Sequence, residues 1–214
     1  MVETLHQEGH KAMVQTAAAS NLGQMVVRIC QQDNIPVVNI VRREEQVELL
    51  RSIGATHVYN SGASSFRHDL LRALKSTGAM VAFDAIGGGA MASDLLSGME
   101  AAAAERMPGY SPYGSSELKR VYIYGLLDPS ATVLARKDYG MHWRVEGWSM
   151  PPILAKAGPA RATELTQRIV NNLTTTFASH YGHEISLAQA LQRDAMLGYC
   201  RQATGQKYLI NPWL

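Results

Sequence analysis

The sequence has no excess of charge of one sign and no basic tract. Lysine and arginine number 20 against 18 aspartates and glutamates, which leaves a formal net charge of +2. A protein that binds a polynucleotide needs a concentrated positive field against the phosphate backbone. The charge balance therefore argues against a nucleic-acid partner.

Cysteine and long apolar runs are also scarce. The two cysteines, Cys30 and Cys200, form no paired spacing of the kind that a structural zinc site or a redox dithiol uses. A reduced, cytoplasmic setting is expected. The first twenty residues carry His6, Glu8 and Lys11 among apolar positions, so they lack the core of a signal peptide or membrane span. We expect no membrane partner.

Motifs for metal binding and hydrolysis are missing too. The closest histidine pairs are His6 with His10 and His180 with His183, and neither lies in an H-E-x-x-H pattern or beside a cysteine cluster. No P-loop and no Ser-His-Asp arrangement is found, and a short-chain dehydrogenase is disfavoured because no Tyr-x-x-x-Lys pair stands on a plausible helix. We expect no metal site.

Short β-rich runs alternate with longer helical runs, the order expected for β-α-β crossovers. We predict an α/β Rossmann fold, with a doubly wound parallel sheet in three layers and a C-terminal helix and strand extension. The predicted strands are residues 12–17, 36–41, 56–60, 79–85, 121–125, 143–148 and 208–210. The predicted helices are residues 22–29, 44–53, 65–77, 99–104, 160–173 and 186–201, and residues 107–119 and 128–140 are predicted to be irregular.

Small residues stand where the first strand must turn into the first helix, in Thr16-Ala17-Ala18-Ala19-Ser20-Asn21-Leu22-Gly23. Against the pattern G-x-G-x-x-G, Ala18 and Ser20 replace the first two glycines and only Gly23 remains. By itself the segment fits a plain strand-to-helix turn as well as a phosphate cradle. The order strand, turn, helix, strand favours the cradle, in which backbone N–H groups face a pyrophosphate.

The second strand ends in Val41-Arg42-Arg43, without the acidic residue that binds the ribose 2′-hydroxyl of NAD. Guanidinium groups can bind a 2′-phosphate through paired, charge-assisted hydrogen bonds. The alternative is that Arg42 and Arg43 are solvated residues at a helix start, where positive charge opposes the helix dipole. The pattern indicates NADP(H) as the cofactor.

Glycines follow the fourth and fifth strands. Asp84-Ala85-Ile86-Gly87-Gly88-Gly89 closes the fourth strand, and Tyr124-Gly125-Leu126 closes the fifth. Both segments lie at the edge of the sheet where ligands bind in this fold, so they are candidates for contact with the nicotinamide end. The alternative for the first segment is a flexible turn before a helix. Asp84 is expected to be structural, and no catalytic proton donor is nominated.

Four segments resemble the quinone oxidoreductase and enoyl reductase branch of the medium-chain dehydrogenase/reductase superfamily. In chain order they look like its phosphate turn, third-strand signature, fourth-strand glycine turn and C-terminal strand. The segments are Ala17–Gly23, Ile53–Asn60, Phe83–Gly88 and Ala203–Ile210. The likeness extends over nearly the whole chain, and it is weakest from Met107 to Met150.

The resemblance implies a zinc-independent, NADP-dependent oxidoreductase that transfers hydride to a quinone or an activated C=C bond. It implies that Ala18, Ser20, Asn21, Leu22 and Gly23 cradle the pyrophosphate and that Arg42 and Arg43 meet the 2′-phosphate. It also implies that Ala85, Ile86 and Gly87, with Tyr124, Gly125 and Leu126, lie at the nicotinamide end. Many relatives have a lysine one turn into the second helix, where this chain has Gln46.

The family begins with a substrate domain that this sequence lacks. Residues 1–185 are expected to form the NADP-binding domain, and residues 186–214 resemble the part that returns to the substrate domain. Isolated domain, truncated product and subunit of a split enzyme stay open, as does a binding module without turnover. The resemblance also implies a homodimer through the predicted edge strand Trp143–Trp148.

Overall fold

A computed structural model of the chain describes residues 1–135, 138–200, 204 and 207–214. At its centre is a six-stranded parallel sheet in the order β3-β2-β1-β4-β6-β8, which confirms the predicted doubly wound fold. The strands are β1 (Met13–Gln15), β2 (Val37–Val41), β3 (His57–Asn60), β4 (Val81–Asp84), β6 (Lys119–Ile123) and β8 (Trp143–Gly147).

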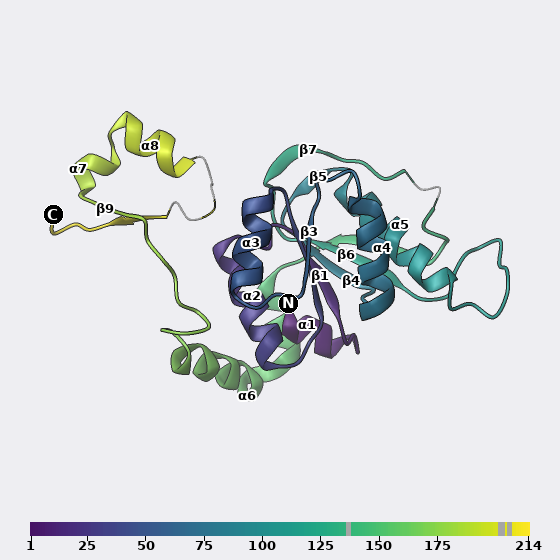
Figure 1. Ribbon diagram of the computed structural model, residues 1–214. Coiled ribbons are helices and arrows are strands. Elements are labelled where there is room, and N and C mark those ends of the chain that lie inside the picture. Colours follow the sequence, from purple (N-terminus) through teal and green to yellow (C-terminus); the bar gives the residue numbers. More distant parts are fainter. Residues whose placement is uncertain (136–137, 201–203, 205–206) are drawn as a thin grey trace.

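Helices cover both faces of the sheet. In Figure 1, α2 (Asn21–Gln32) and α3 (Glu44–Ser52) lie on one side of the strands, and α4 (Phe66–Thr77) and α5 (Met91–Ala104) lie on the other. Apolar side chains of the sheet pack against α2 and α3 in two clusters and against α4 and α5 in a third. Because both faces are covered, β1, β2 and β4 are buried at every position, and their residues are apolar except for Gln15, Asn39 and Asp84.

The strand order places the site. From β1 the chain moves outward through β2 to β3, and it then returns to lay β4 on the other side of β1. The direction of winding therefore reverses between β1 and β4. In open α/β sheets, ligands bind beyond the carboxyl ends of the strands at such a reversal. We call this side of the sheet, where β1, β2, β4 and β6 end, the carboxyl edge.

Two segments differ from the prediction at this edge. The glycine segment after β4 forms a short strand, β5 (Gly87–Gly89), which pairs in parallel with β7 (Asp128–Thr132), inside a stretch predicted to be irregular. The sequence of β7 carries a proline and little apolar character, because most of the strand is exposed. Burial patterns cannot indicate a strand that packs against so little.

The last third of the chain also departs from the predicted bounds. The helix predicted from residue 160 begins at residue 150, as α6 (Met150–Asn171), and is interrupted at Gly158, whose φ is +82°. The helix predicted over residues 186–201 is two helices, α7 (Leu187–Ala190) and α8 (Arg193–Cys200), and Arg201 lies outside the described residues. None of the described residues of α6 or α8 is buried, so periodic burial gave no guide to their ends.

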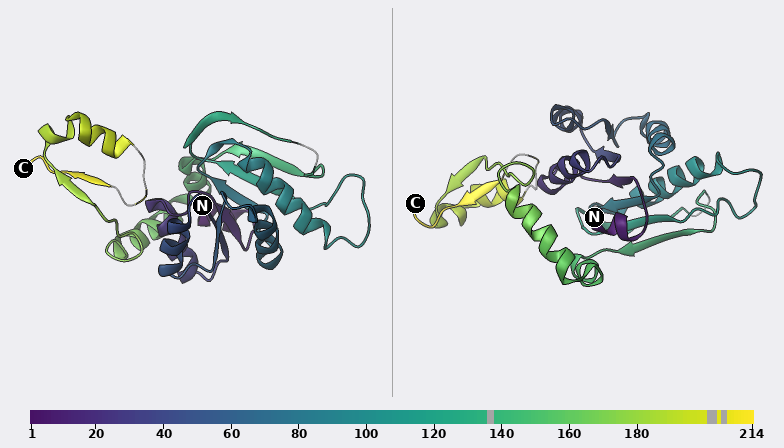
Figure 2. Two further views of the ribbon diagram at one scale, coloured as in Figure 1. Left: turned by 45° about the horizontal axis from the view of Figure 1, so that its top comes forward. Right: turned by 90° about the horizontal axis from the view of Figure 1, so that it is seen from below.

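The residues after α6 form a separate C-terminal unit. Strand β9 (His183–Ile185) pairs in parallel with β10 (Tyr208–Ile210), and α7 and α8 connect the two strands. In both views of Figure 2 this unit projects from the side of the main sheet. The bond pair from Arg168 to Asp33, at 2.8 Å each, ties the end of α6 to the end of α2. At the other end of the chain, α1 (Val2–Gln7) packs against α6.

The outer position of β8 leads to a prediction about assembly. We expect a homodimer in which two β8 edges join, detected by light scattering at tens of micromolar chain. The amide of Trp148 donates to Ile123 at 2.9 Å, so by alternation the Val145 amide faces away from β6. Val145→Pro removes that outward donor and should yield monomers. A monomeric mass for the unmodified chain would contradict the expectation.

Candidate functional site

The turn from β1 into α2 is tight and rigidly bonded. Ala17 adopts a left-handed conformation, with φ +48°, and the Ala18 amide donates to the Ile40 carbonyl of the neighbouring strand at 3.1 Å. Ser20 is the N-cap of α2, and its hydroxyl accepts from the Gly23 amide at 3.1 Å. The serine at the second glycine position of the pattern therefore stabilises the helix start.

Gly23 is the one glycine that this turn requires. A β-carbon there would overlap the carbonyl group of Ala18, far inside contact distance. Ala18 is itself fully buried, so its backbone cannot move aside at low cost. Asn21 and Leu22 are exposed beside it, at the first turn of α2. The first amides of a helix have no intrahelical partner, so this end of α2 offers N–H donors at the carboxyl edge.

Asp84 holds the end of β4 to the end of β1. Its carboxylate accepts from the Thr16 hydroxyl at 2.6 Å and from the amides of Ile86 and Gly87 at 2.9 and 3.1 Å. Thr16 in turn accepts from the Ala85 amide at 2.8 Å. Asp84 is fully buried, as expected of a structural residue. Sequence reasoning missed Thr16, whose partner lies 68 residues away.

The backbones that follow β4 and β6 lie in close contact. A β-carbon on Gly125 would stand 2.5 Å from the Ala85 carbonyl oxygen, and one on Gly87 would stand 2.7 Å from the Gly125 carbonyl oxygen. Gly87 also has φ +80°, which favours glycine. The structure thus brings together Ala85, Gly87 and Gly125. Leu126, beside them, is mostly exposed.

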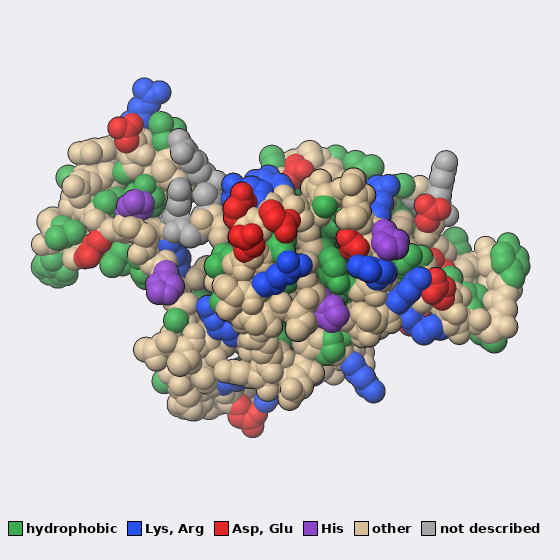
Figure 3. Space-filling view, in the orientation of Figure 1, with side chains coloured by type: hydrophobic (Ala, Val, Ile, Leu, Met, Phe, Trp, Pro, Cys, Tyr) green, Lys and Arg blue, Asp and Glu red, His purple; other side chains and the backbone are tan. Residues whose placement is uncertain are grey.

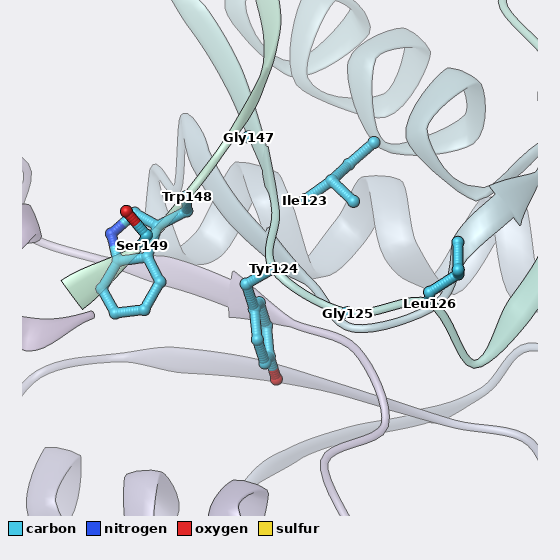
Figure 4. Close-up of a pocket in the computed structure, with 7 residues that line it drawn as sticks. All are labelled: Ile123, Tyr124, Gly125, Leu126, Gly147, Trp148 and Ser149. Carbon is cyan, nitrogen blue, oxygen red and sulfur yellow. The ribbon is translucent and has the colours of Figure 1, made fainter.

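An open hollow of about 560 Å³ lies next to this contact, between the ends of β6 and β8 (Figure 4). The rings of Tyr124 and Trp148 meet edge to face, with centroids 6.3 Å apart, and form one wall. Burial and the charge of Asp84 raise the pKa of Tyr124 to about 12, so its phenol remains a proton-bearing donor at neutral pH. The lining residues are Ile123, Tyr124, Gly125, Leu126, Gly147, Trp148 and Ser149.

Four of these residues were not foreseen as part of the site: Ile123 at the end of β6, and Gly147, Trp148 and Ser149 at the end of β8. The sequence showed Gly147 and Trp148 only as the end of a predicted strand, with Ser149 just after it, and the nearness of these three to Tyr124 depends on β8 pairing with β6. A signal was present, however, because β8 is parallel and ends at the same edge as the other strands. Any residue just after such a strand is a candidate for ligand contact.

Arg42 and Arg43 follow β2 at the other end of the carboxyl edge. Both are exposed, and their backbone amides donate to the side-chain oxygen of Gln46 at 3.0 and 3.2 Å. Gln46 therefore fixes the start of α3, and the side chains of Arg42 and Arg43 are exposed beside it. Figure 3 shows basic and acidic side chains intermingled over α3, so any anion selectivity here is local.

The fold places Arg42 and Arg43 at a fixed distance from the glycine contact between the ends of β4 and β6. Arg42 follows β2 and Gly125 follows β6, and the strands β1 and β4 lie between β2 and β6. Three strand spacings correspond to about 14 Å. The turn from β1 into α2 lies between them. An elongated ligand with its anionic part near the middle would fit this arrangement.

Within residues 1–135, 138–200, 204 and 207–214, no three histidines, cysteines or carboxylates gather where they could hold a metal ion. The same residues include no helix with the length and apolar character needed to cross a membrane.

Comparison with known proteins gives a family model that matches part of the chain and several structures with a similar fold. Residues 22–119 match the family described as zinc-binding dehydrogenase. No curated protein matches the chain in sequence. Among solved structures, one described as an NADPH:quinone reductase from Mesorhizobium loti is 29% identical, with a TM-score of 0.70 over 98% of this chain and 56% of that one.

Two further structures show the same fold at lower identity. One described as an NADPH:quinone reductase from Bacillus thuringiensis is 16% identical, with a TM-score of 0.66 over 94% of this chain and 55% of that one. The Etr1p/NADP/crotonyl-CoA complex, whose protein is a Candida tropicalis enoyl thioester reductase, is 17% identical. Its TM-score is 0.64 over 94% of this chain and 53% of that one.

This chain spans just over half the length of each of these structures. The expected resemblance is confirmed in sequence over residues 22–119 and in fold over nearly the whole chain. The protein is similar to the nucleotide-binding half of the medium-chain dehydrogenase/reductase superfamily, in its quinone reductase and enoyl reductase branch.

Proposed function

We propose that the chain binds NADPH along the carboxyl edge and positions the nicotinamide for hydride transfer to a quinone or an activated C=C bond. The observation that carries the proposal is the order of three features along one edge. Arg42 and Arg43 lie at β2, the N-terminus of α2 lies at β1, and the close glycine contact lies between β4 and β6. A dinucleotide phosphate presents a 2′-phosphate, a pyrophosphate and a nicotinamide riboside in that order.

The phosphate turn suits the middle of such a ligand. Ser20 uses its hydroxyl to cap the helix, so the amides of Asn21 and Leu22 are the donors in position for a pyrophosphate. Ala18 is buried and Gly23 has no side chain, so neither obstructs the approach of the ligand. The absence of glycine at the first two positions of the pattern does not close this cradle.

The nicotinamide end is served by small residues and an aromatic wall. Ala85, Ile86 and Gly87 hold their backbone against Gly125, and the hollow beyond them offers Tyr124 and Trp148 as packing surface. NADPH supplies the hydride, while the protein supplies orientation and a packing surface on one side. The residues of this chain thus bind and orient the cofactor, and no zinc ion is included in the proposal.

We expect NADPH to bind more tightly than NADH. Charge-assisted contacts from Arg42 and Arg43 to the 2′-phosphate should contribute about 1.5 to 3 kcal/mol, or roughly ten- to a hundredfold in affinity. The double variant Arg42→Ala with Arg43→Ala should lose that factor for NADPH and keep its affinity for NADH, as measured by calorimetric titration. Arg51→Ala is the matched control, because Arg51 lies in the last turn of α3, the helix that begins after Arg43.

Two results would contradict this assignment. Equal affinity of the unmodified chain for the two cofactors would remove the role of the arginines. An Arg51→Ala loss as large as that of the double variant would show that the general charge of α3, and not the two named side chains, is responsible.

A second candidate is a cofactor-binding module or split-enzyme subunit without turnover of its own. The observation that favours it is the shape of the site, since the hollow at the nicotinamide end is open and is built from one side of the sheet edge. Cofactor binding is common to both candidates. Turnover by the chain alone distinguishes them.

A further inference from the structure

The proposed phosphate cradle contains no charged side chain of its own. Residues 16–23 are threonine, alanine, serine, asparagine, leucine and glycine only. The N-terminus of α2 carries a partial charge of roughly +0.5 through the helix dipole. A pyrophosphate is more negative than that. A cation from elsewhere in the chain would therefore strengthen binding.

The C-terminal unit brings a lysine to this place. Asn21, the first residue of α2, donates its side-chain amide to the Ser179 hydroxyl at 3.0 Å. The Lys207 ammonium group donates to the same hydroxyl at 3.3 Å, and it lies 4.9 Å from the centroid of the Tyr181 ring. One hydroxyl group thus separates the Lys207 cation from the helix start. These residues are 158 and 28 positions apart in the two bonds, so only the folded chain shows the link.

We propose that Lys207 is a phosphate-binding residue that supplies the missing cation for the cofactor pyrophosphate. This inference rests on the proposed function. A lysine ammonium has three donors, and Ser179 takes one of them, so two remain for phosphate oxygens. Tyr181 holds the ammonium group over its ring face. Ser179 is a positioning residue, because it aligns Lys207 with Asn21.

A structural role alone would not require this lysine. The C-terminal unit is already bonded to the helices of the main sheet at a residue before Ser179 and at a residue before Lys207. Gln32 donates to the Thr176 hydroxyl at 2.8 Å, and Gln46 donates to the Thr204 hydroxyl at 2.8 Å. Both contacts are neutral, whereas Lys207 brings a charge to the end of a helix where a cation is otherwise unfavourable. An anion between them would make that placement favourable.

The test compares two cofactors that share the pyrophosphate and differ at the 2′ position. Lys207→Gln should weaken the binding of NADPH and NADH by the same factor, roughly five- to tenfold. Lys207→Arg should retain most of the affinity, and Ser179→Ala should show a smaller loss, equal for the two cofactors. Lys11→Gln is the control, because Lys11 lines a hollow at the opposite edge of the sheet.

Three outcomes would overturn the proposal. Unchanged affinities in Lys207→Gln would exclude a phosphate contact, and a loss confined to NADPH would assign Lys207 to the 2′-phosphate instead. An equal loss in Lys11→Gln would reduce the effect to net charge. If the unmodified chain binds neither cofactor, the proposed function fails. Inorganic pyrophosphate then decides on Lys207 alone, through an NMR shift of the Asn21 amide that is expected in the unmodified chain and lost in Lys207→Gln.

Discussion

The chain by itself should bind NADPH and yet oxidise it with quinones or enoyl thioesters at a negligible rate. Hydride transfer needs the donor and acceptor carbons held together and water excluded, and proximity of this kind can contribute about 7 to 11 kcal/mol to lowering the barrier. The residues at the nicotinamide end form one wall, from Ile123 to Leu126 and from Gly147 to Ser149. The lining residues that the structure describes all belong to this wall, so they would hold a substrate from one side only.

A chimaera provides the comparison. The Mesorhizobium loti protein is longer than the region it shares with this chain. The residues of that protein that precede the shared region can be fused ahead of residue 1. Turnover of NADPH by the chimaera should exceed that of the chain alone by at least roughly a thousandfold, a modest share of the proximity effect. The same fusion carrying Arg42→Ala and Arg43→Ala should need a far higher NADPH concentration to reach half of its maximal turnover. Comparable turnover from the chain and the chimaera would mean that residues 1–214 complete the pocket themselves.

The second large effect concerns stability. Lys119, at the start of β6, is fully buried, and its ammonium group bonds to the Glu100 carboxylate and, at 3.0 Å, to the Ser115 hydroxyl. Ser115 also donates to Glu100 through its amide and its hydroxyl, each at 2.7 Å. Lys119→Met would leave the carboxylate without its counter-charge. The expected loss in free energy of unfolding is about 3 to 5 kcal/mol.

Denaturation in urea measures this loss. The double variant Lys119→Met with Glu100→Leu should recover most of it, because two apolar groups replace the buried pair. Lys75→Met is the matched control, since Lys75 pairs with Glu105 on the surface and should cost at most about 1 kcal/mol. Equal losses from Lys119→Met and Lys75→Met would contradict the role of the buried pair.

The pH dependence gives an independent check of the same pair. Burial opposes ionisation of Glu100, but the bonds from Lys119 and Ser115 outweigh it and hold its pKa below the ordinary value of 4.5. A carboxyl group whose pKa is lowered in the folded state stabilises the protein at any pH above its ordinary pKa. That stabilisation is lost as the pH falls through the pKa of the folded state. The difference in free energy of unfolding between the unmodified chain and Lys119→Met should therefore become smaller at acid pH. A gap independent of pH would exclude the charge of Glu100 as its cause.

Much of the main sheet could be predicted, since its inner strands β1, β2 and β4 are buried on both faces and the helices beside them have one apolar side. The end of α4 could also be predicted, because Gly78 adopts the left-handed conformation that ends a helix, and its amide donates to the Leu74 carbonyl at 2.8 Å. The proposed phosphate turn and the two arginines could be nominated for a similar reason. Each depends on residues close together in the sequence, which a linear pattern can show.

The remainder depends on contacts between distant segments. The bond from Thr16 to Asp84, the approach of Trp148 to Tyr124 and the chain from Asn21 to Lys207 all join residues that no local pattern relates. Strand β7 and the start of helix α6 were not predicted, because both elements are largely exposed and burial therefore leaves no periodic pattern in their sequences. Part of the predicted C-terminal signature, residues 203, 205 and 206, lies outside the described residues.

The most direct test is a crystal structure of the chain with NADPH bound. The pyrophosphate should lie at the amides of Asn21 and Leu22, the 2′-phosphate should lie against Arg42 and Arg43, and the nicotinamide should reach the hollow beside Trp148. An NADPH molecule in a different orientation along the carboxyl edge, or bound away from that edge, would contradict the proposed site.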